Sequence, residues 1–114
     1  MRRETELDAL ESAVSRLADS IAGLSDDGSG RQDALKDVFR INQEIGRIAR
    51  SLDWMAPALR DMQLEVNLTT IQIKNGRSGS AREAFAKVSS SFAKVMATQA
   101  SGRPGREPAF RRNL

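Results

Sequence analysis

Side chains suited to catalysis are scarce in this chain. It contains no histidine and no cysteine, which removes the commonest general base, the commonest metal ligand and every thiolate. A Ser-His-Asp triad, a Cys-His dyad and a zinc-ligand set are therefore excluded. We expect a protein without enzymatic activity, cofactor or bound metal.

The carboxylates that remain have simpler explanations than acid–base chemistry. Asp33 and Asp37 lie one helical turn apart, but Lys36 and Arg40 share their surface, so ion pairs explain the cluster. The Asp26-Asp27 pair lacks the D-x-D-x-D-G pattern of a calcium loop. We interpret it as part of a solvent-exposed turn.

Two other features could bind phosphate. The segment 75–80 is rich in glycine before a predicted helix, but it lacks a Walker lysine and a preceding strand, so we expect a hairpin turn. Charge is unevenly distributed within a net charge of +3: the first 30 residues are acidic and the segment 77–114 is basic. Four arginines near the C-terminus are candidate contacts for phosphate groups or an acidic partner: Arg103, Arg106, Arg111 and Arg112.

The elements that would position these residues are helices. Apolar side chains recur at alternating spacings of three and four residues along one segment, as in the a and d positions of a heptad repeat. We call this set the seam; it comprises Val38, Ile41, Ile45, Ile48, Leu52, Met55, Leu59, Met62, Val66, Thr69 and Ile73. Shorter apolar stripes precede and follow the seam, at Leu7, Leu10, Val14, Leu17, Ile21 and Leu24, and at Phe85, Val88, Phe92 and Val95.

These patterns predict an all-α protein with three antiparallel, coiled-coil-like helices at about 5–24, 30–75 and 81–100. Thr5 is the expected cap of the first helix, and capping-box spacings place the starts of the other two near Ser29 and Ser80. The first helix is expected to pack on the first half of the long helix and the third on its second half. Two such chains would form a four-helix bundle on dimerisation.

Pro57 is the one objection to a continuous long helix. An interior proline costs about 3 kcal/mol and bends the helix. The heptad phase is unchanged across it, and no glycine lies nearby, so we favour a helix kinked at Pro57. The alternative is a break at 53–57, which would leave a monomeric four-helix bundle.

Residues 1–102 are expected to form a single helical domain, and 103–114 a disordered basic tail. No apolar run is long enough to span a membrane, and no signal-peptide core follows the N-terminus. The expected location is the cytoplasm.

The second half of the long helix has a second apolar stripe. Positions c and f, opposite the seam, carry Trp54, Pro57, Leu64, Leu68 and Ile71. A helix that is apolar on opposite faces needs cover on both, and a second copy of the chain is the simplest cover. The sequence therefore predicts a homodimer with these residues at the interface. The alternative is that the first helix covers the stripe within a compact monomer.

The second hairpin resembles the cytoplasmic signalling hairpin of bacterial methyl-accepting chemotaxis receptors. The resemblance covers residues 58–97. Leu64, Asn67, Lys74, Gly76 and Gly79 match the end of that family's long helix and its tip, and Phe85-Ala86-Lys87-Val88 resembles the start of its return helix. The glutamates of the family's tip are replaced here by Thr70, Gln72 and Ile73, and Pro57 has no counterpart. The resemblance implies a dimeric antiparallel four-helix rod.

The function expected from the sequence is that of a non-enzymatic helical protein–protein interaction module, a small signalling or scaffold protein. The alternative is a nucleic-acid accessory or regulatory protein that uses the arginines of its basic tail on phosphates.

Overall fold

The computed structural model describes residues 7–101, which form four α-helices joined by short connections. Helix α1 spans Asp8–Ala22, α2 spans Arg31–Ser51, α3 spans Ala56–Lys74 and α4 spans Ser78–Ser101. A single turn of 3-10 helix, η1 (Asp53–Met55), lies between α2 and α3. The all-α prediction is confirmed.

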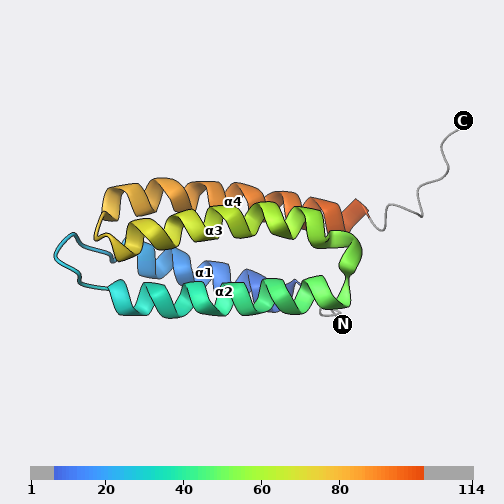
Figure 1. The fold of residues 1–114 in the computed structure, drawn as a ribbon, viewed down its shortest axis with the longest axis horizontal. Helices are drawn as coiled ribbons and strands as arrows, with labels where there is room; N and C mark the ends of the chain where they lie inside the picture. The colour runs from blue at the N-terminus through green and yellow to red at the C-terminus, as the bar shows by residue number, and fades with distance from the viewer. Residues whose placement is uncertain (1–6, 102–114) are drawn as a thin grey trace, which may run out of the picture.

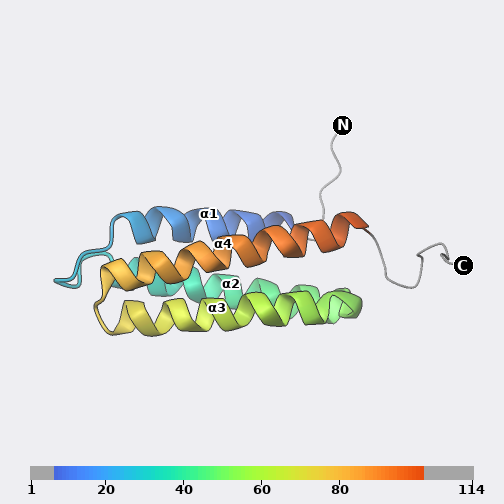
Figure 2. The ribbon, with the colours of Figure 1, turned by 90° about the horizontal axis from the view of Figure 1, so that it is seen from above.

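The four helices lie side by side and alternate in direction along the chain (Figure 1). The α1–α2 loop and the α3–α4 turn lie at one end of the bundle, and the α2–α3 connection lies at the other. α3 packs most extensively on α4, and α1 packs on α2; α2 also contacts α3, and α1 contacts α4. Figure 2, the view from above, shows α1 beside α4. The predicted pairing of the first helix with the first half of the seam, and of the last helix with its second half, is confirmed.

The seam forms the centre of the core. Each of its members is buried except Leu52, which is half-buried. The stripe of α1, from Leu7 to Leu24, is buried against it, as are Val88, Phe92 and Val95 of α4. Thr69 is the polar member of the seam, and its hydroxyl donates to the Glu65 carbonyl oxygen one turn earlier at 2.9 Å. Its hydrogen bond is therefore satisfied inside its own helix.

The prediction of one long helix kinked at Pro57 is wrong, and the break that we considered as its alternative is present. Helix α2 ends at Ser51, because its C-cap Leu52 has φ of −128° and ψ of 73°, outside helical geometry. Pro57 consequently lies in the first turn of α3, where a backbone N–H has no helical acceptor and proline is well tolerated. A proline at position 57 would destabilise a continuous helix, but it is compatible with the first turn of α3.

Two predicted helix starts also require correction. Helix α2 begins after Gly30, which has φ of 84° and no side-chain cap, instead of after a Ser29 cap. Helix α4 begins at Ser78, so Ser80 lies within its first turn instead of capping it. The predicted cap Thr5 and the basic tail 103–114 lie outside the described residues. In the described part of the chain, no helix combines the length and apolar character needed to cross a membrane.

Candidate interaction surfaces

Helix α3 carries an apolar stripe on the face that points away from the core. Leu64, Leu68 and Ile71 are 57%, 49% and 50% exposed, although the seam residues on the opposite face are buried. We call these three residues the α3 stripe. The spacings of four and three residues place them on one face of the helix, and neither α2 nor α4 covers that face completely. The alternative prediction, that the first helix covers this stripe, does not hold.

The other two predicted interface residues are placed differently. Trp54 belongs to η1, is half-buried and packs against the core. Its indole N–H is enclosed without a hydrogen-bond acceptor among the described residues. Pro57 is exposed at the start of α3, two turns from Leu64. The structure therefore brings three of the five predicted residues together and assigns Trp54 to the α2–α3 connection.

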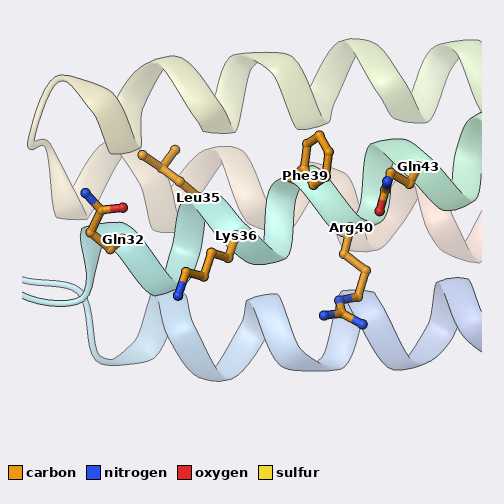
Figure 3. Close-up of a pocket in the computed structure, with 6 residues that line it drawn as sticks. All are labelled: Gln32, Leu35, Lys36, Phe39, Arg40 and Gln43. Carbon is orange, nitrogen blue, oxygen red and sulfur yellow. The ribbon is translucent and has the colours of Figure 1, made fainter.

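The outer face of α2 has a shallow hollow of about 430 Å³ lined by residues of this one helix (Figure 3): Gln32, Leu35, Lys36, Phe39, Arg40 and Gln43. Phe39 is 64% exposed, and in Figure 3 its ring and Leu35 point toward α3, whereas Lys36 and Arg40 point toward α1. Our sequence interpretation placed Lys36 and Arg40 on this surface and missed Phe39. The signal was available, because Phe39 is a large apolar residue outside the seam.

The predicted ion pairs around this hollow are not formed. Lys36 and Arg40 make no ion pair with any residue that the structure describes. Asp37 instead accepts a hydrogen bond from the Ser20 hydroxyl of α1, which ties α1 to α2. Two cations, with the carboxylates of Asp19, Asp33 and Asp37 in the neighbouring hollow toward α1, therefore border an exposed aromatic ring on the outer face of α2.

A third cluster joins the two loops at one end of the bundle. Asp26, in the α1–α2 loop, accepts hydrogen bonds from the backbone N–H of Ser78 at 2.9 Å and from its hydroxyl at 2.7 Å. Asp26 thus satisfies an otherwise unpaired N–H group at the start of α4, where negative charge is also favourable. In return, Arg82 of α4 donates to the carbonyl oxygens of Leu24 at 2.7 Å and Ala22 at 3.3 Å, at the end of α1.

The hydrogen bonds from Ser78 lower the pKa of Asp26, and Arg82 adds a smaller electrostatic effect in the same direction. The hydrogen bonds therefore favour the charged carboxylate, and protonation of Asp26 at acidic pH would weaken them. The α1–α2 hairpin thus caps the start of α4, and the α3–α4 hairpin caps the end of α1. These reciprocal hydrogen bonds hold α1 beside α4. Its hydrogen bonds are satisfied within the chain, which indicates a structural role.

None of these surfaces offers a metal site, since among residues 7–101 no group of carboxylates is placed to hold an ion. The chain matches no protein-family model, no curated protein and no solved structure.

Proposed function

We propose that this chain is a non-enzymatic helical protein–protein interaction module that associates with a second copy of itself. The α3 stripe carries the proposal. Three large apolar side chains on one face of a helix, each about half exposed, are an arrangement that usually marks an interface. A twofold axis beside α3 would pack the stripe of one copy against the stripe of the other.

The exposed areas set the strength of such a dimer. Burying a Leu or Ile side chain completely is worth roughly 1.5–3 kcal/mol, so a half-exposed one has about half of that still to gain. Six such side chains in a symmetric dimer would contribute roughly 5–9 kcal/mol, against about 4–15 kcal/mol lost on association. At the favourable end of both ranges about 5 kcal/mol remains, so contact through the stripe alone supports a weak dimer with a dissociation constant of at best a few hundred micromolar.

The double variant Leu64→Glu/Leu68→Glu tests this interface. Both positions are exposed, so the monomer should keep its helical content and melting temperature, while dimerisation should weaken by at least about a hundredfold. Sedimentation equilibrium from 10 μM to 1 mM measures the effect. Ala86→Glu/Ala93→Glu, at exposed positions of α4, introduces the same charge elsewhere and should leave dimerisation unchanged. A native protein that remains monomeric at 1 mM, or equal effects of the two variants, would contradict the proposal.

The signalling or scaffold role rests on the resemblance of the α3–α4 hairpin to chemoreceptor signalling hairpins, and the exposed stripe lies within the segment that carries that resemblance. The alternative, nucleic-acid binding through Arg103, Arg106, Arg111 and Arg112, depends on residues outside the described part of the chain. No contact on the described surface favours it, and the interaction module is the function that we propose.

A further inference from the structure

The seam keeps one heptad phase across a point where the chain reverses direction. Its spacings of three and four residues run from Ile48 through Leu52 and Met55 to Leu59 without an insertion, yet α2 and α3 are separate antiparallel helices. A hairpin imposes no such requirement, because each of its helices can meet the core in a phase of its own. A continuous helix does impose it. The observed monomer is therefore compatible with the phase but does not require it.

The connection between α2 and α3 is itself close to helical. The Leu52 N–H bonds to the Ile48 carbonyl oxygen at 2.7 Å, in the helical pattern, and the Met55 N–H bonds to the Leu52 carbonyl oxygen at 2.9 Å, in the 3-10 pattern. Ala56 has helical dihedral angles (φ −53°, ψ −41°), and Met55 (φ −91°, ψ −3°) lies at the edge of the right-handed helical region. Leu52 is where the backbone departs from helical geometry, and no glycine lies between α2 and α3.

We propose that the α2–α3 connection is a hinge that opens into one continuous helix, and that two opened chains exchange their α3–α4 hairpins. Each α1–α2 hairpin then packs on the α3–α4 hairpin of the second copy, through the contacts that the closed monomer makes within one chain. The partner is a second copy of this chain. The exchange forms through the seam and not through the α3 stripe, and it rests on the proposed function only in that the chain associates with a second copy of itself.

The register of the opened form is favourable at its centre. Two antiparallel long helices related by a twofold axis at residues 53–54 place Leu52 of one chain opposite Met55 of the other. Both are apolar members of the seam, so the seam would continue without a polar gap across the hinge. The hydrogen bonds from Ser78 to Asp26 would form between chains instead of within one, with the same geometry. Opening therefore sacrifices none of the inter-hairpin contacts, as is typical of exchanged dimers.

Pro57 opposes this opening. In the closed chain it occupies the first turn of α3, where its missing N–H has no consequence. In a continuous helix its ring would clash with the Asp53 carbonyl and remove a hydrogen bond. Replacing Pro57 with alanine should therefore favour the exchanged dimer, by about a hundredfold for each chain that opens.

Intrachain distance distinguishes the two states directly. The chain has no native cysteine, so spin labels can be attached to Lys36→Cys and Lys74→Cys, both at exposed positions. In the closed monomer these positions lie near the same end of adjacent helices, about 10–25 Å apart. In the continuous helix 38 residues separate them, which corresponds to about 57 Å. Pulsed electron spin resonance on labelled protein diluted into excess unlabelled protein reports the distance within one chain alone.

The labelled pair is examined with and without Pro57→Ala, after refolding at about 1 mM so that exchange is complete. We expect the short distance to dominate in the native chain, and the long distance to dominate in Pro57→Ala together with a dimeric mass. The matched control adds one alanine after Leu52 to the Pro57→Ala chain. The closed connection can accommodate the residue, whereas a continuous helix would turn the second half of the seam by 100° away from its partner. The control should return to a short distance and a monomeric mass.

The outcomes separate this proposal from the interface on the α3 stripe. A Pro57→Ala chain that keeps the short distance at 1 mM overturns the hinge. A short distance in a dimer that Leu64→Glu/Leu68→Glu dissociates also overturns it, while leaving the stripe interface in place. A long distance that survives the two glutamates supports the hinge and shows that the stripe is not needed for association. A long distance that persists after the alanine insertion contradicts the argument from the heptad phase.

Discussion

Three glycines provide a graded test of the structure, because an added methyl group would meet a different obstacle at each. Gly79 lies in the first turn of α4, and a Cβ there would have no neighbour within 4 Å. Gly76 has φ of 73°, and a Cβ would come within 3.3 Å of Nη2 of Arg31, the end of a flexible side chain. Gly30 has φ of 84°, and a Cβ would lie 3.2 Å from the backbone oxygen of Gly23. A backbone atom cannot move aside as easily as the end of a side chain.

The expected changes in the free energy of unfolding follow from these surroundings. Gly79→Ala should stabilise the protein by about 0.5–1 kcal/mol, because alanine favours the helix. Gly76→Ala should destabilise it by about 1–2 kcal/mol, the cost of a left-handed conformation with a Cβ. Gly30→Ala should cost more than that, roughly 2 kcal/mol or above, since the backbone must also move away from the methyl group.

Urea denaturation followed by circular dichroism measures all three variants under one set of conditions. Each kcal/mol corresponds to about 4–8 °C in melting temperature for a bundle of this size. The order Gly79→Ala, native, Gly76→Ala, Gly30→Ala, from most to least stable, is the essential result. Equal effects at positions 76 and 79 would refute the assigned conformation of the α3–α4 turn. A stabilising Gly30→Ala would refute the close approach of the two ends of the α1–α2 loop.

Two further predictions concern single polar groups. The pKa of Asp26 is lowered in the folded protein, so its contribution to stability is fully present above the ordinary carboxyl pKa and is lost as the pH falls below about 4. In urea titrations, the stability advantage of the native chain over Asp26→Asn should therefore shrink between pH 7 and pH 3. An advantage independent of pH would exclude the hydrogen bonds to Ser78 as its source. The buried Thr69 hydroxyl bonds to its own helix, so Thr69→Val, which keeps the volume, should change the free energy of unfolding by less than about 1 kcal/mol; a loss above about 2 kcal/mol would show that the hydroxyl has a partner in another helix.

The residues of the core could be predicted from the sequence, because burial in a helical bundle is encoded locally. A stripe at spacings of three and four residues presents one face of a helix whichever partner covers it. Leu10, Leu17, Val88 and Val95 are buried for this reason, as is the seam. The stripe residues Leu64, Leu68 and Ile71 were found by the same argument, since positions opposite a buried face are exposed unless something covers them.

The helix boundaries at the loops depended on contacts that no local pattern reveals. Asp26 and Ser78 are 52 residues apart in sequence, and their hydrogen bond exists only because α1 and α4 are neighbours. The capping-box spacing at Ser80 is a local signal, and it predicted that α4 begins three residues later than it does. Phe39 was missed because the face around it carries cations, and its exposure becomes clear only when the positions of α1 and α3 are known.

The direction of the chain after Leu52 was decided by tertiary structure. A seam in unbroken phase fits one long helix or two antiparallel helices around a common core, since both bury the same side chains. Proline at position 57 disfavours the long helix, but its cost of about 3 kcal/mol is small beside the apolar burial that either arrangement provides. Packing of α2 against α3 within one chain avoids that cost and needs no second copy of the protein. The heptad phase is a property of the sequence alone, and it is compatible with both arrangements.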